Sequence, residues 1–413
     1  MTQPVSSARR RDDSTLVDFE DPRDSSGAEA PKPPPRLNDA ILYLGMNESS
    51  AAVEMAALGH GVTAVLGQID PKIDTKFGTF HLDDDAQVRG FASKFAAHYG
   101  LSSAVAEKLE AVLVHTEPKG RDELARIALY LGRAESGQGT MPSRLVLSGH
   151  SAGGAMWGDT TGHFSLDAIC ELGKLFPTAA RNVEDIHFAG CFTYRPLRDE
   201  RAKWEASFPS LKTMWGYDQF SPHAPVDHLA AWQLATLGRG QISEATVRAH
   251  PGAVSWSTGT GYIDGGVDAA KLARAKATAD ARFDDYVSGK IRVTDPHEDA
   301  VHDDYATYHR LAARGDTAAG VRAELLLRAR FYEKSVRGEF AARYGDQVGD
   351  AYRALGLPAP DFSKLTRAEA LSSIERFQNA AGAPPRPDVA GAWTVLDRLR
   401  ALNPSFVRTD WIY

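Results

Sequence analysis

A histidine and a cysteine each follow a short apolar segment of the chain. His150 comes directly after the run RLVLSG, residues 144–149, and Cys191 comes directly after DIHFAG, residues 185–190. A thiol is a weak nucleophile until it loses its proton, so a reactive cysteine needs a nearby base or cation, and imidazole serves near neutral pH. The two positions therefore predict a Cys191 nucleophile with His150 as its base, provided that the fold brings the side chains together.

The surrounding pattern predicts the fold that would do so. Short apolar runs alternate with amphipathic stretches of helical length, which is typical of an α/β fold with a mostly parallel sheet and helices on both faces. Strands are expected at residues 41–46, 62–68, 111–116, 144–149, 185–190 and 211–217. The carboxyl ends of parallel strands share one edge of a sheet, and neighbouring strands are roughly 5 Å apart. His150 and Cys191 are thus expected within reach of each other.

Length and composition divide the chain into three regions. A chain of 413 residues is long enough for two or three domains. Residues 1–38 are polar and rich in proline, so we expect a disordered leader that could address a partner or an export machine. Residues 39–245 carry the strand–helix alternation and form the expected catalytic domain. Residues 246–413 are mostly helical in pattern and form an accessory region.

Charge and cysteine usage exclude several classes of protein. Lys and Arg number 47 against 54 Asp and Glu, a net charge of −7, which argues against a nucleic-acid partner. No apolar run approaches the roughly 18 residues of a membrane span, and the N-terminus lacks a Sec-type signal, so a cytoplasmic, soluble protein is expected, with non-classical export left open. Two cysteines cannot build a disulfide scaffold. Cys170 lies in an apolar helical pattern and is expected to be core.

The two motifs resemble those of a known peptidase group. Ser148-Gly149-His150 and Gly190-Cys191 are similar to the motifs of the caspase-like (clan CD) cysteine peptidases, which include caspases, metacaspases, clostripain relatives and bacterial CHAT proteases. The resemblance covers roughly residues 41–240 and implies a caspase-like sheet sandwiched by helices. One position departs from the family pattern, because Ser151 stands where the family usually has glycine.

The resemblance also implies a mechanism and a substrate class. Cys191 would attack a peptide carbonyl, while His150 would activate the thiol and protonate the leaving amine. The backbone amides of Ser151 and Cys191 would form the oxyanion hole. The substrate would be a protein or peptide, and neither a cofactor nor a metal is needed for this chemistry.

Further residues are candidates for substrate binding. The segment LKTMWGYDQFSP, residues 211–222, is similar to the family's strand after the cysteine, which helps to build the pocket for the residue before the cut bond, P1. The candidates are Asp70, Asp159, Tyr217, Asp218 and Ser221. Many bacterial members of the family cut after a basic P1 residue. Asp70 and Asp218 are possible acids that would bind such a residue here. Asp159 could line the rim of the active site.

Two other functions remain open. Residues 149–153 spell G-x-S-x-G, the nucleophile elbow of α/β-hydrolases, in which Ser151 would attack an ester and a later histidine, such as His297 or His302, would be the base. The segment after it carries glycine and threonine where that fold needs a long helix, and no HGGG-type motif precedes it. The second alternative is a caspase-like scaffold that binds a partner without catalysis. The acidic segment 295–304 is expected to be a solvated loop rather than a metal site.

Overall fold

The computed structural model describes residues 38–159, 161–291, 298–335 and 341–401. Within this part of the chain, seven strands form a central sheet in the order β12-β11-β10-β9-β5-β1-β2. Its strands are β1 Ile41–Gly45, β2 Val62–Leu66, β5 Arg144–Ser148, β9 Asp185–Ala189, β10 Thr213–Tyr217, β11 Ala253–Ser257 and β12 Gly261–Asp264. From β2 to β10 all neighbours are parallel, whereas β11 pairs antiparallel with both β10 and β12. The expected α/β fold with a mostly parallel sheet is confirmed.

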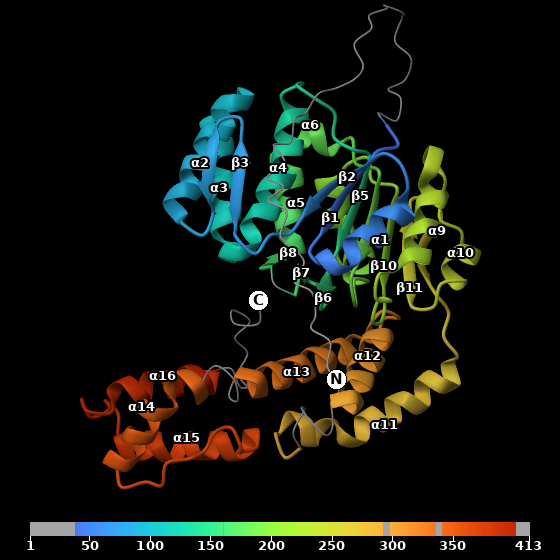
Figure 1. The fold of residues 1–413 in the computed structure, drawn as a ribbon. Coiled ribbons are helices and arrows are strands. Elements are labelled where there is room, and N and C mark those ends of the chain that lie inside the picture. Colours follow the sequence, from blue (N-terminus) through green and yellow to red (C-terminus); the bar gives the residue numbers. More distant parts are fainter. Residues whose placement is uncertain (1–37, 160, 292–297, 336–340, 402–413) are drawn as a thin grey trace, which may run out of the picture.

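Helices cover both faces of this sheet (Figure 1). Alternate residues of each buried strand point to opposite faces. Leu42 and Leu44 of β1 therefore enter the core with α2 Asp85–Tyr99, α3 Ser103–Val114, α4 Arg121–Glu135, α5 Leu166–Leu175 and α8 Arg201–Ser207. Ile41 and Tyr43 enter the core of the other face, under α1 Glu48–Leu58, α9 Val226–Thr236 and α10 Glu244–Arg248. Both faces are thus buried, which accounts for the continuous apolar runs.

Two small sheets lie outside the central one. β3 Lys72–Thr75 and β4 Gly78–His81 form an antiparallel hairpin. β6 His150–Ser151, β7 Ala155–Trp157 and β8 His163–Ser165 form a second antiparallel sheet, which begins directly after β5. The short helices α6 Pro177–Ala180 and α7 Arg195–Arg198 and the turns η1 Pro118–Gly120 and η2 Leu237–Arg239 complete the α/β unit.

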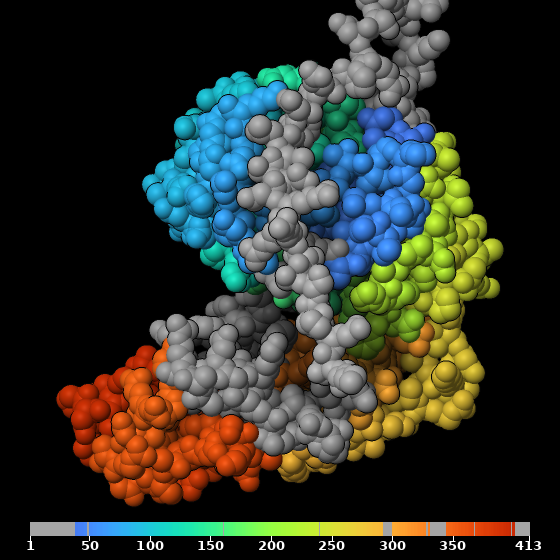
Figure 2. All heavy atoms as spheres, viewed as in Figure 1, coloured from blue at the N-terminus to red at the C-terminus, as the bar shows by residue number. Residues whose placement is uncertain are grey.

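The C-terminal region is helical, as expected. α11 Ala269–Val287, α12 Glu298–Ala312 and α13 Thr317–Ser335 share one apolar cluster, and α14 Ala341–Ala354, α15 Arg367–Ala381 and α16 Ala390–Ala401 share another. Thr366 and Glu369 form the capping box expected at the start of α15. α12 lies below the carboxyl ends of the central strands, and Figure 2 shows the helical region as a second mass beneath the α/β unit. The solvated loop expected at residues 295–304 is wrong for residues 298–304, which are the start of α12 with Val301 and Asp304 buried, and residues 295–297 lie outside the described residues.

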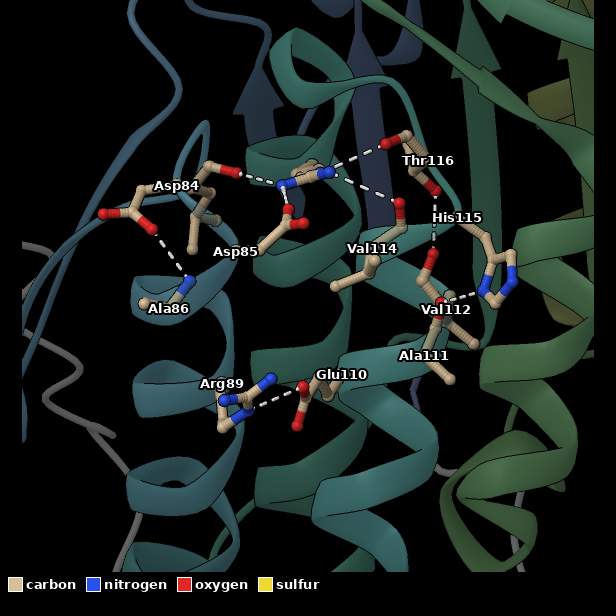
Figure 3. Close-up of polar contacts among 12 residues, drawn as sticks. Asp84, Asp85, Ala86, Arg89, Glu110, Ala111, Val112, Val114, His115 and Thr116 are labelled. Atoms are coloured by element: carbon tan, nitrogen blue, oxygen red, sulfur yellow. Dashed lines mark hydrogen bonds and ion pairs between the residues drawn. The ribbon is translucent and has the colours of Figure 1, made fainter.

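One expected strand is instead the end of a helix. Residues 111–116 were predicted as a strand, but α3 continues to Val114, with Leu109 and Leu113 buried four residues apart on one face. Polar contacts close its last turn: the Thr116 hydroxyl donates to Val112 O at 2.9 Å, and His115 Nδ1 lies 2.6 Å from Ala111 O (Figure 3). Such contacts satisfy the carbonyls that a helix end leaves unpaired. A short apolar run does not distinguish strand from buried helix by itself.

The boundary expected at residue 245 is also too early. β11 and β12 follow it, and both belong to the central sheet. β11 is fully buried, because Trp256 packs on one face of the sheet and Ala253 on the other. The α/β unit therefore extends to Asp264, and the helical region begins with α11. The leader expected at residues 1–38 lies outside the described residues, apart from Asn38.

Candidate active site

Both motif residues lie at the carboxyl edge of the sheet. β5 and β9 are adjacent parallel strands in which Ser148 pairs with Ala189, and the Gly149 N–H donates to Ala189 O at 3.2 Å. His150 and Cys191 each lie two residues beyond these paired residues, and both line one cavity of about 210 Å³. Ser151 lines the same cavity.

The glycines before the two residues are required by this close approach. A Cβ atom at position 190 would lie 2.9 Å from both Gly149 O and Ser151 Cβ, and a Cβ atom at position 149 would lie 2.8 Å from Trp157 O. Contacts this short force the backbone to shift. The Gly-His and Gly-Cys patterns thus have a local steric cause, which is that two strand ends and the β6–β7 hairpin crowd together.

His150 has a carboxylate partner. Its Nε2 atom lies 2.8 Å from Asp159 Oδ1, and the two side chains are 47% and 65% exposed. The Asp159 N–H donates in turn to Asn47 Oδ1 at 2.9 Å, which ties the segment after β7 to the start of α1. Of the predicted substrate-binding residues, Asp159 is therefore placed against the histidine.

Cys191 lies at the junction of the sheet and the helical region. Its Sγ atom is 3.7 Å from Ser221 Oγ, and the side chain packs against the apolar cluster of α11–α13. The next residue, Phe192, has a φ of 59°, which is uncommon for a residue with a side chain, and its N–H donates to Gln219 O at 3.0 Å. Among the described residues, no backbone carbonyl accepts a hydrogen bond from the Cys191 N–H.

The second cysteine lies in a different environment. Cys170 is fully buried in α5, as expected, and burial raises the pKa of its thiol to about 12. A thiol with this pKa stays protonated at neutral pH, and a buried protonated thiol behaves as a small apolar side chain.

Ser151 does not have the surroundings of an elbow nucleophile. It is buried, and its hydroxyl accepts a hydrogen bond from Gly153 N–H at 3.0 Å. The residues that follow form the β6–β7 hairpin rather than a helix. The strand–turn–helix geometry that exposes an elbow serine is therefore missing here.

Three further candidates lie away from the cavity. Asp70 is exposed in the turn after β2 and is not among the residues that line it. Tyr217 is fully buried, with its hydroxyl 3.3 Å from His187 Nε2. Asp218 is 1% exposed and ion-paired, 2.7 Å from Arg314 Nη1 and 3.7 Å from Arg310 Nε. Asp218 therefore ties the helical region to the sheet.

The residues missed by sequence reasoning come mainly from the helical region. Val301 and Tyr305 of α12 and Leu326 and Leu327 of α13 line the same cavity as His150 and Cys191. Val301 and Tyr305 are four residues apart, which is the spacing of one helix face, but the acidic residues around Val301 favoured a solvated loop. The pattern did not indicate which surface that face would cover.

A larger groove adjoins the cavity. It has a volume of about 1340 Å³ and runs between the end of α3, the β7–β8 hairpin, α5 and α13. The groove and the cavity share Ala152, Trp157, Leu327 and Arg330. Glu117, Asp167 and Glu171 supply carboxylates to its walls.

Comparison with protein-family models, with curated proteins and with solved structures found no match for the chain. Among the described residues, no cluster of three or more His, Cys, Asp or Glu side chains is arranged to hold a metal ion. The same residues include no helix with the length and apolar character needed to cross a membrane.

Proposed function

We propose that the protein is a caspase-like cysteine endopeptidase in which Cys191 is the nucleophile and His150 the general acid–base. The observation that carries this proposal is the position of both residues: they follow paired residues of adjacent parallel strands and line one cavity. This is the order and placement that the resemblance to clan CD peptidases requires.

The chemistry would proceed in two steps. With Nε2 engaged by Asp159, His150 would accept the thiol proton at Nδ1, and the Cys191 sulfur would attack the peptide carbonyl carbon. The carbon–nitrogen bond then breaks, the amine leaves with the proton from His150, and a thioester remains on Cys191. Water attacks the thioester, His150 takes the proton of the water, and the acid product is released as the thiol is restored.

The backbone amide of Cys191 supports the proposed oxyanion hole. The Cys191 N–H has no backbone acceptor within the described chain, so it remains free to donate to a carbonyl oxygen bound beside the sulfur. We propose the Ser151 amide as the second donor. The Ser151 hydroxyl is already bonded to Gly153 N–H, so the side chain that replaces the family's glycine is held within the hairpin.

The adjoining groove supports a polymeric substrate. A groove of about 1340 Å³ exceeds the roughly 300–1,000 Å³ typical of small-molecule sites. It meets the catalytic cavity at Trp157 and Leu327, so an extended peptide could cross both. We therefore favour an endopeptidase over an esterase that acts on a small molecule.

Four chains tested on one labelled protein substrate separate the candidate functions. We expect Cys191→Ala to abolish cleavage, and Cys170→Ala, the matched cysteine control, and Ser151→Ala to retain it. If Ser151→Ala loses activity while Cys191→Ala keeps it, the protein is instead an α/β-hydrolase-type esterase. Hydrolysis of an ester substrate would then be measured in the same four chains. If the unmodified chain cleaves neither substrate, the peptidase proposal fails and a binding scaffold becomes the better account.

A further inference from the structure

The cavity beside Cys191 has mostly apolar walls. Phe192 contacts both Phe220 and Tyr305, with ring centroids 4.8 and 4.7 Å apart. The other apolar lining residues are Ala152, Trp157, Val301, Leu326 and Leu327. Outside the proposed catalytic residues and Ser151, polar groups in the lining belong to His302, Arg330, the Tyr305 hydroxyl and the Trp157 indole N–H, and none of the described lining residues is Asp or Glu.

The volume of the cavity fits one side chain. It measures about 210 Å³, while an apolar cavity of about 150 Å³ is large enough to hold a benzene molecule. A leucine or phenylalanine side chain could therefore enter beside the thiol.

Charge complementarity disfavours a basic residue in this cavity. A Lys or Arg side chain would lose its hydration without meeting a carboxylate among the described lining residues. Asp218, which the sequence suggested as an acid for such a residue, is instead ion-paired with Arg314. A substrate aspartate would likewise lose its hydration, because its carboxylate would be surrounded by the apolar side chains of most walls.

We infer that this cavity is the P1 pocket and takes an uncharged, apolar side chain of leucine or phenylalanine size. The inference rests on the proposed peptidase function and differs from the basic preference that the resemblance to bacterial clan CD peptidases suggested. The helices α12 and α13 supply Val301, Tyr305, Leu326 and Leu327 to this pocket. The helical region would therefore select the P1 side chain, whereas the strand ends of the sheet position the Cys191 nucleophile.

The test uses four peptidyl chloromethyl ketones that differ only at P1, which is Leu, Phe, Lys or Asp. In each, the Cys191 sulfur displaces chloride and the thiol proton is lost, so the intact mass of the full-length chain reports the rate of alkylation. We expect the Leu and Phe probes to react at least about tenfold faster than the Lys and Asp probes. Equal rates, or faster reaction of the Lys or Asp probe, would overturn the apolar pocket. The proposed peptidase function would still hold if the chain cleaves a protein substrate and Cys191→Ala abolishes that cleavage.

A variant at the mouth of the pocket tests the assignment of its walls. Phe220 is 42% exposed, so Phe220→Asp should leave the fold intact, which circular dichroism would check. The new carboxylate should raise the relative rate of the Lys probe about tenfold or more. Val321→Asp on α13 is the matched control, since Val321 is 58% exposed and does not line the cavity. An unchanged order of rates in Phe220→Asp would overturn the assignment.

Discussion

The imidazole Nε2 atom of His150 lies 2.8 Å from a carboxylate oxygen of Asp159, in the segment after β7. This contact orients the ring of the proposed base, because Asp159 is itself held by Asn47 at the start of α1. In the proposed mechanism Asp159 acts through His150 and touches no substrate atom, so it is a positioning residue.

Replacing Asp159 should lower turnover moderately. The pair is largely exposed, and exposed ion pairs are worth up to about 1 kcal/mol, so we expect Asp159→Ala to reduce kcat about fivefold. KM should change little, because the substrate does not contact Asp159. Asp83→Ala, which removes another exposed acid, is the control. Steady-state kinetics on one peptide would check this, and a pure KM effect would mean that Asp159 binds substrate.

Removing the carboxylate of Asp218 should loosen the helical region from the sheet. Asp218→Asn leaves Arg310 and Arg314 without their buried counter-ion. Because both arginines are partly exposed, we expect a loss of about 1–3 kcal/mol in the free energy of unfolding, less than for a fully buried pair.

Urea unfolding and limited proteolysis would measure this effect. Asp264→Asn is the matched control, since Asp264 contacts the same Arg314 at 3.6 Å but is 38% exposed, and it should cost little. Equal losses in the two variants would show that burial of Asp218 does not matter.

The sequence predicted the sheet because its central strands are buried on both faces and bounded by glycines. The runs ending at Gly149 and Gly190 could also be assigned to one edge, since parallel strands align their carboxyl ends. Sequence reasoning failed for residues 111–116, where an apolar run of strand length belongs to a helix whose start lies at Ser102, well before the run.

The partners of the site residues were harder to predict. The contact of Asp159 with His150 depends on the β6–β7 hairpin, whose strands of two and three residues are too short to show a period. The contact of Tyr305 with Phe192 joins residues far apart in sequence. An amphipathic helix shows that one of its faces is buried, but it does not show which surface covers that face.

Acid should destabilise the packing of α12 against Phe192. His309 is buried, stacks on Phe192 at 4.3 Å and faces Tyr194 and Tyr305. Burial lowers its pKa to about 3, with Arg195 adding to the effect. Below pH 6.5 the unfolded chain binds a proton at this position that the folded chain excludes, so stability falls with falling pH from about 6.5 towards 3.

From pH 7 to pH 5 this group alone accounts for at most about 2 kcal/mol. Urea unfolding at the two pH values should show a smaller loss in His309→Phe, which keeps an aromatic ring against Phe192. His60→Gln removes an exposed histidine and should leave the pH dependence unchanged. The same loss in all three chains would contradict the assignment to His309.

A buried carboxyl pair in α4 should make the folded state less stable as pH rises, which is opposite to the effect expected for His309. Asp122 and Glu123 are fully buried, and Gly67 gives Glu123 its space, since a Cβ atom there would lie 2.8 Å from Glu123 Oε1. Burial and the neighbouring Asp122 raise the pKa of Glu123 to about 9. Between the ordinary pKa of Glu and this value the folded state holds a proton that the unfolded state has lost, so stability falls as pH rises.

Glu123→Gln should therefore gain stability relative to the unmodified chain as pH rises from 5 to 9, by no more than about 1.4 kcal/mol per pH unit. The neutral amide has nearly the size of the protonated acid, so the cavity in the α/β core stays filled. Urea unfolding at pH 5, 7 and 9 would measure the difference, with Glu107→Gln, an exposed position on α3, as the control. A constant difference across this range would show that Glu123 is already ionised in the folded protein.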